Sequence, residues 1–112
     1  MTTDRRNPPI SVAVIPGTGA PDATVCLVGE LDLAGVTILA TALQERLIAG
    51  QFRLRLDLSE LTFCDAAGLG VLLEWHRQIT AAGGALVLAN VRPGLARIMR
   101  LTQVDSVLRL SR

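Results

Sequence analysis

Hydrophobic and polar residues alternate along two stretches of the chain in the manner of β-strands. Residues 10–15 alternate with a period of two, and residues 52–58 do so more strictly, with apolar side chains on one face and Arg53, Arg55 and Asp57 on the other. Residues 23–28 are almost continuously apolar, so we expect a strand covered on both faces or nearly so. The turn-rich loop before that strand predicts an antiparallel hairpin with the first.

Helical spacing of apolar residues follows, and strands and helices then alternate. We expect helices over residues 36–48, 66 to about 82 and 93–101, and further strands over 85–89 and 107–110. Gly50 suits the position after the first helix, and Asp65 suits the N-cap of the second. The order β-β-α-β-α-β-α-β predicts an α/β fold: a mixed sheet of about four to five strands with three to four helices and mainly parallel pairing.

The second predicted helix has one apolar side and two apolar residues outside it. On a helical wheel one arc holds Ala66, Leu69, Leu72, Leu73, His76 and Ile79. Val71 and Trp75 fall outside this arc. Trp75 is therefore either an apolar anchor at an interface with a partner or a side chain packed under a neighbouring loop or the third helix.

Composition indicates a small protein that needs neither a metal nor a disulfide to fold. Its 112 residues are 50% hydrophobic with a formal net charge of +1, which allows one domain over residues 10–112 behind a polar lead-in at 1–9. The basic residues are scattered, so we expect no direct nucleic-acid binding. No apolar run approaches the roughly 18 residues that span a bilayer, so we expect no membrane segment and a cytoplasmic location.

The two cysteines are expected to stay free. Cys26 belongs to the second predicted strand and Cys64 lies beyond the end of the third, which should put their Cα atoms farther apart than the roughly 7 Å that a disulfide allows. They have neither CxxC spacing nor nearby histidines. We therefore predict two small apolar side chains in a reducing compartment.

Candidate catalytic groups are few. His76 is the only histidine and lies on the apolar arc, and no strand is followed by a phosphate-binding glycine motif. We therefore expect no enzyme, no cofactor and no metal. Asp32 and Asp65 follow two predicted strands, so they could share the sheet edge where ligands of parallel sheets usually bind. Asp65 could equally be a simple helix cap, and Asp57 a solvated strand residue.

Three segments resemble the STAS domain of bacterial anti-sigma factor antagonists. They read VGELDL at 28–33, LDLSELTFCDAAGLGVLL at 56–73 and AGGALVLAN at 82–90. The resemblance extends from about residue 10 to residue 110. It implies a STAS-like mixed sheet and a protein that binds an anti-sigma factor, often itself a serine kinase, and thereby regulates sigma-dependent transcription.

The resemblance also implies a switch that this chain lacks. In the family a serine directly after the aspartate is phosphorylated, whereas Ala66 and Ala67 stand after Asp65 here. A phosphate there would add about two negative charges beside Asp65. The chain should therefore be insensitive to phosphorylation at this site, with Ser59 and Thr62 as the nearest substitute acceptors. The expected partner-binding residues are Glu30, Asp32, Asp65, Ala66, Ala67, Gly68, Leu69, Val71 and Trp75.

Two other functions stay open at this point. Free-standing STAS subunits of lipid-transport complexes look similar, so an accessory subunit of an ABC-type transporter ATPase is the alternative. A nucleotide-binding domain is disfavoured by the missing phosphate loop. The oligomeric state, the identity of the partner and whether Ala66 is natural or engineered do not follow from the sequence.

Overall fold

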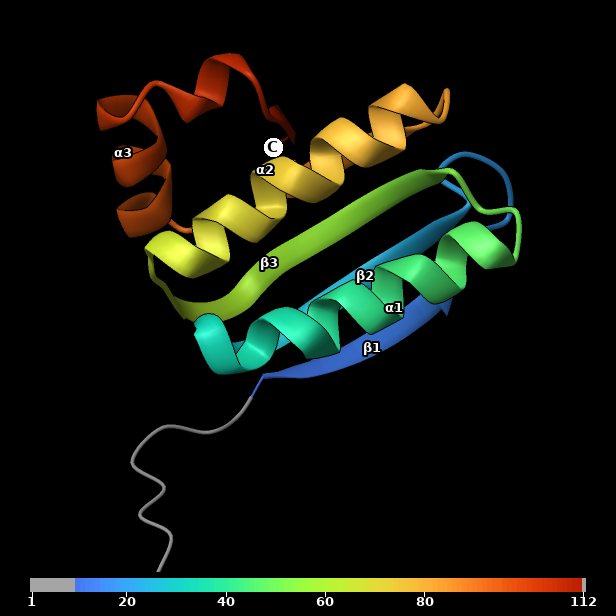
Figure 1. Cartoon of the computed structure of the whole chain (residues 1–112), viewed down its shortest axis with the longest axis horizontal. Helices are drawn as coiled ribbons and strands as arrows, with labels where there is room; N and C mark the ends of the chain where they lie inside the picture. The colour runs from blue at the N-terminus through green and yellow to red at the C-terminus, as the bar shows by residue number, and fades with distance from the viewer. Residues whose placement is uncertain (1–9, 112) are drawn as a thin grey trace, which may run out of the picture.

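The computed structural model describes residues 10–111 and shows a β-sheet with helices packed on one of its faces (Figure 1). The expected polar lead-in, residues 1–9, lies outside the described residues. The strands are β1 (Ser11–Pro16), β2 (Ala23–Leu31), β3 (Arg53–Cys64), β4 (Ala85–Ala89) and β5 (Arg109–Ser111).

The sheet has the strand order β1-β2-β3-β4-β5. The β1–β2 pair is antiparallel, as the hairpin prediction required, and the other three pairs are parallel. Each parallel neighbour is reached through a helical crossover, which is the connection that parallel pairing needs. The predicted mixed α/β sheet is therefore confirmed.

The helices match the predicted positions closely. They are α1 (Val36–Ile48), α2 (Ala66–Ala81) and α3 (Pro93–Leu101), with short 3-10 helices η1 (Leu33–Gly35) and η2 (Val104–Ser106). Within residues 10–111, none of them is long and apolar enough to cross a membrane. The last strand was expected at 107–110 but pairs only from Arg109, because Leu108 is buried in the core and the chain turns through η2 before it.

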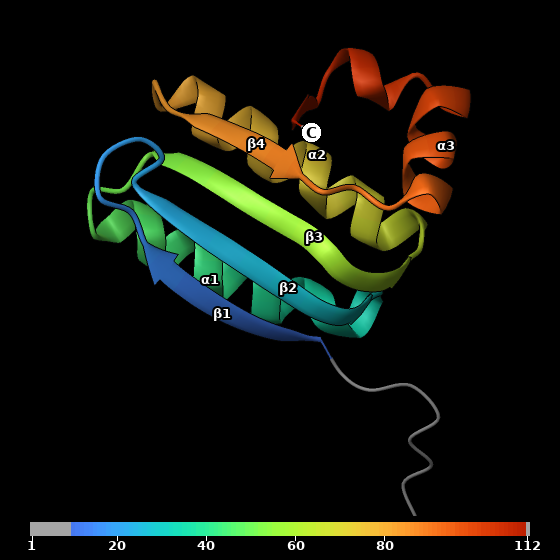
Figure 2. The ribbon, with the colours of Figure 1, turned by 180° about the vertical axis from the view of Figure 1, so that it is seen from behind.

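One face of the sheet carries α1 and α2, and the opposite face is open (Figure 2). The expectation that residues 23–28 are covered on both faces is therefore wrong. Ala23, Val25 and Leu27 are buried under the helices. Thr24 and Cys26 are half-buried and Val28 is exposed, because they point to the open face. Small and β-branched side chains hid the alternation from a reading of hydrophobicity alone.

Helix α2 is rotated by about a quarter turn from its predicted orientation. Its buried residues are Gly68, Leu72, Trp75 and Ile79. Trp75 is only 8% exposed and lies beside Leu47 and Ile48 of α1, so it is neither an interface anchor nor packed under α3. Leu73 and His76 are half-buried instead, on a side that faces Val107. The apolar side of α2 is wide because it contacts two neighbouring segments, α1 and the region around Val107. The centre that the sequence pattern predicted lies between these two contacts.

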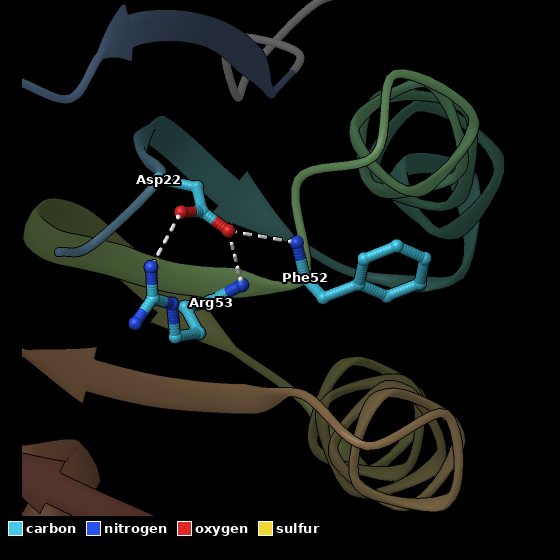
Figure 3. A network of polar contacts seen from close by, with 3 residues as sticks. All are labelled: Asp22, Phe52 and Arg53. Atoms are coloured by element: carbon cyan, nitrogen blue, oxygen red, sulfur yellow. Dashed lines mark hydrogen bonds and ion pairs between the residues drawn. The ribbon is translucent and has the colours of Figure 1, made fainter. Parts of the chain in front are cut away.

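The start of β3 is held to the start of β2 by one carboxylate (Figure 3). Asp22 accepts hydrogen bonds from the backbone N–H groups of Phe52 and Arg53, both at 3.0 Å, and forms an ion pair with the Arg53 guanidinium at 3.2 Å. The backbone hydrogen bond from Arg53 is the main reason why the pKa of Asp22 is lowered. This contact fixes the register of the two central strands at their first residues.

The two cysteines are free thiols in the structure, as predicted. Cys26 pairs with Asp57, whereas Cys64 pairs with Leu31 at the other end of the same two strands. The five residue steps from Cys26 to Leu31 correspond to about 16 Å along β2. A disulfide between the cysteines is therefore incompatible with this fold.

Candidate functional site

Asp32 and Asp65 lie side by side at the carboxyl ends of the two central strands. The last residues of these strands, Leu31 and Cys64, are paired, and the Asp65 N–H donates to the Leu31 carbonyl at 3.2 Å. Each aspartate is the next residue along its own strand. The structure thus brings the two together at the shared sheet edge that the sequence indicated.

Both aspartates begin a helix. Asp32 Oδ1 accepts from the Gly35 N–H at 3.1 Å and caps η1, and Asp65 Oδ1 accepts from the Gly68 N–H at 2.9 Å and caps α2. The predicted N-cap role of Asp65 is confirmed. Both residues remain half-buried, so their carboxylates keep acceptor capacity toward solvent or a partner.

Gly68 allows α2 to start directly against the end of β2. A β-carbon at this position would lie 2.5 Å from the Leu31 carbonyl oxygen and 2.9 Å from Cys64 Sγ. Any side chain would therefore push the first turn of α2 away from the strand. Gly68 is buried and positions its neighbours, and it does not offer a contact surface.

The surface around the two caps combines acidic and exposed apolar side chains. Leu33 on η1 is 76% exposed and Phe63 near the end of β3 is 49% exposed. Ala66 in the first turn of α2 is also exposed, and Ala67 is half-buried. We name this the strand-end surface, and it consists of Glu30, Asp32, Leu33, Phe63, Asp65, Ala66 and Ala67.

A groove of about 370 Å³ adjoins the strand-end surface between the end of β3 and the start of α3. We name it the β3–α3 groove, and its lining consists of Leu61, Thr62, Phe63, Cys64, Arg92, Pro93, Gly94, Leu95 and Ile98. Sequence reasoning missed it because β3 was expected to stop at residue 58. The further alternation of Leu61 and Phe63 with polar neighbours was the available signal.

Four of the predicted site residues are buried or half-buried on α2 and lie outside this surface. Gly68 and Trp75 are buried, and Val71 is half-buried against the core, not free as the wheel suggested. Leu69 is also half-buried. Leu69, Val71 and Trp75 therefore pack into or against the core.

Asp57 lies in the middle of the sheet, well before the strand ends. Its Oδ1 accepts from the Ser59 N–H at 2.9 Å and from the Asn90 side chain at 3.2 Å. The Ser59 hydrogen bond is the first cause of the lowered pKa of Asp57. Asp57 is half-buried and hydrogen-bonded, so it is more constrained than the solvated strand residue that the sequence suggested.

The two substitute hydroxyls differ in their availability. Thr62 is the residue that the register skips between Leu61 and Phe63, and its Oγ1 donates to the Gly29 carbonyl at 3.0 Å across this bulge. Ser59 is exposed on the strand. A modification at Thr62 would therefore break a contact between β2 and β3, whereas one at Ser59 would not.

Titratable groups near the site do not converge. Burial, and secondarily Asp65, raise the pKa of the Cys64 thiol to about 12, so it stays protonated near neutral pH. The pKa of His76 is lowered, first by burial and then by Arg109. Among residues 10–111, no three His, Cys, Asp or Glu side chains gather closely enough to hold a metal ion.

Comparison with known proteins places this arrangement in one class. The family model described as "Mlab, STAS domain" matches residues 18–110. The chain is 28% identical over 90 residues to the anti-sigma-B factor antagonist of Bacillus subtilis, covering 80% of this chain and 82% of the relative. It is 30% identical over 82 residues to a Bordetella bronchiseptica protein provisionally named anti-sigma factor antagonist BtrV, with 73% and 71% covered.

The fold is also that of the anti-sigma factor antagonist SpoIIAA from Bacillus. The unphosphorylated form of that protein superimposes with a TM-score of 0.68 at 18% identity, covering 91% of this chain and 88% of SpoIIAA. The phosphorylated form gives the same TM-score. The sheet, its one-sided helical cover and the paired strand ends define a STAS domain, and this chain belongs to the STAS domain family.

Proposed function

We propose that this chain is an anti-sigma factor antagonist that binds its anti-sigma factor through the strand-end surface. The observation that carries the proposal is the pairing of Leu31 with Cys64, which sets the caps Asp32 and Asp65 side by side and leaves Leu33 and Phe63 exposed around them. A mixed acidic and apolar surface of this kind suits protein docking. The relatives named as anti-sigma factor antagonists support the choice of partner.

The proposed role is regulatory and not catalytic. The chain would occupy an anti-sigma factor and free a sigma factor, so its site of action is the bacterial cytoplasm, where transcription takes place. The partner could itself be a serine kinase. Because Ala66 has no hydroxyl, such a kinase could bind this chain without switching it at that position.

Affinity capture tests the partner. The chain is coupled to a resin and incubated with lysate of the bacterium that encodes it, and bound proteins are identified by mass spectrometry. An anti-sigma factor is expected, and its purified form should bind the chain directly in calorimetry. Direct binding of a purified transporter ATPase instead would contradict the proposal.

Restoring the hydroxyl tests the missing switch. Ala66→Ser should accept phosphate at position 66 from the purified anti-sigma kinase and ATP, and the phosphorylated variant should lose affinity because its new charge adjoins Asp65. The wild type should stay unmodified at 66. Ala34→Ser adds a hydroxyl on η1 at another exposed alanine and should not be phosphorylated. Phosphate on Ser59 in the wild type would show that the switch has moved.

A further inference from the structure

The second half of β3 has an unpaired edge. β4 accompanies β3 only from Arg53 to Asp57, so residues 58–64 have β2 on one side and no strand on the other within the described chain. Apart from this pairing with β2, the backbone of residues 58–64 makes no further backbone–backbone hydrogen bond within residues 10–111, and the Ser59 N–H donates to the Asp57 carboxylate at 2.9 Å. Seven residues of strand correspond to about 20 Å of free edge.

An exposed strand edge is a template for another extended segment. Its outward N–H and C=O groups supply the hydrogen bonds of an additional strand, and pockets beside the edge select alternate side chains. The β3–α3 groove provides such pockets, because Leu61, Phe63, Leu95 and Ile98 line it beside the free edge. Ile98 is 45% exposed in this groove.

The charges of the groove lining and of helix α3 have one sign, whereas the free edge itself carries Glu60, which lies outside the lining. Within the part of the chain that the structure describes, Arg92 is the only charged residue of the groove lining. Helix α3 adds Arg97 and Arg100 and contains no acidic residue. A segment that enters the groove therefore matches the charge of α3 when its own side chains facing α3 are carboxylates. A second copy of this chain does not supply them through β1 or β5, the outer strands of the sheet, since β1 reads SVAVIP and β5 reads RLS and neither has an acidic residue.

We propose that the β3–α3 groove binds an extended segment of the partner in which apolar residues alternate with carboxylates, added as a strand along residues 58–64 of β3. The proposal rests on the proposed function, because it names the part of the anti-sigma factor that enters this site. The segment docks beside the strand-end surface, so both belong to one continuous interface. Backbone pairing supplies part of the affinity, and Arg92 with the apolar lining supplies the selection.

Peptides test the groove without a partner. The probes are a blocked nine-residue peptide alternating valine and glutamate, its lysine counterpart, and the glutamate peptide with N-methylated valines. In NMR titrations the glutamate peptide should shift the amide signals of residues 58–64 and 92–98, and the other two should bind at least about tenfold more weakly. Shifts centred on β1, or none up to the solubility limit, would overturn the proposal.

Matched variants locate the contact. Gly94 lines the groove and has open space at its β-carbon, so Gly94→Trp should fill the groove and abolish glutamate-peptide binding while the thermal midpoint is kept. Arg92→Glu should weaken binding more than Arg97→Glu, which changes the same net charge outside the lining. Ile98→Asp should weaken it about tenfold, whereas Ile48→Asp at the exposed end of α1 should not. Equal effects within either pair would contradict the assignment.

Hydrogen exchange with the captured partner separates this proposal from the proposed function. If both hold, a purified anti-sigma factor slows amide exchange in residues 58–64 and loses affinity for Gly94→Trp. If an anti-sigma factor binds with unchanged exchange there and normal affinity for Gly94→Trp, the groove proposal fails and the function stands. If a different protein binds and protects residues 58–64, the function fails, and the groove's preference for an extended acidic segment is retained.

Discussion

The two halves of β3 differ although they form one continuous strand. Residues 54–57 are paired on both sides, by β2 and β4, and Asp22 holds the preceding Arg53, which pairs with β4. Residues 58–64 are paired with β2 alone, contain the bulge at Thr62 and carry exposed Phe63 next to their last residue. The first half resembles the interior of a sheet, and the second half resembles its rim.

This difference separates stability from recognition along a single element. Buried alternate leucines in the first half contribute to the free energy of folding and present nothing to a partner. The second half offers backbone and apolar surface that the fold itself leaves unused. Substitutions in the two halves should therefore have different consequences, and the following predictions test this from the largest expected effect to the smallest.

Leu56→Ala should have the largest effect on stability. Leu56 is fully buried in the first half of β3, so the substitution should lower the free energy of unfolding by about 2–5 kcal/mol. Chemical denaturation monitored by circular dichroism measures the loss. Affinity for the anti-sigma factor, corrected for the folded fraction, should stay unchanged, and a specific loss of affinity would break the comparison.

Phe63→Ala should weaken partner binding and change stability only slightly, the reverse of Leu56→Ala. Phe63 is half-exposed, so its loss should cost less than about 1 kcal/mol of stability but weaken partner binding by about tenfold. Calorimetric titration at constant salt measures the affinity. Phe52, a second partly exposed phenylalanine just before β3, is the control, and Phe52→Ala should leave affinity unchanged.

Asp65 should contribute to both properties. Asp65→Ala removes the cap of α2 and should cost about 0.5–2 kcal/mol, whereas Asp65→Asn keeps a capping oxygen and should retain near-native thermal stability. Asp65→Asn should still lose a few-fold in affinity, because the docking carboxylate is gone. Asp57→Asn, in the first half of β3, should bind like the wild type. Equal affinity of wild type and Asp65→Asn would reduce Asp65 to a helix cap.

The smallest effect concerns pH. The folded state lowers the pKa of His76, so its stabilising contribution is present above about pH 6.5 and is lost as pH falls through the folded-state pKa. Asp57 also has a lowered pKa, so its contribution is lost only below about pH 4. The free energy of unfolding, measured by chemical denaturation at pH 7 and at pH 5, should change less between the two pH values for His76→Gln than for the wild type. An identical difference would show that other groups cause the change.

Much of the fold followed from local patterns, and the failures have physical causes. The alternation at Leu54 and Leu56 and the cap at Asp65 are set within a few residues, so the sequence predicted them. The burial of Trp75 depends on where α1 lies, and a helical wheel contains no information about a neighbouring helix. The free edge of β3 depends on where β4 stops, which is a non-local property of the register.

Only part of the candidate site could be predicted from the sequence. The shared edge of Asp32 and Asp65 follows from strand order alone. The β3–α3 groove needs the position of α3 relative to β3, and Ile98 gave no sign of it because its spacing is also typical of a buried helix face.

The direction of β1 has a practical consequence for attaching this domain to a surface. β1 runs antiparallel, so Ser11 lies opposite Val28 near the strand ends, and a β-carbon at Gly35 of η1 would lie 2.9 Å from Cγ2 of Ile10. A reporter or tether fused directly before Ile10 therefore begins beside the docking side. Gly19 lies in the loop at the opposite end, with open space at its β-carbon. A maleimide linker on Gly19→Cys would hold the domain with its binding side facing the solution.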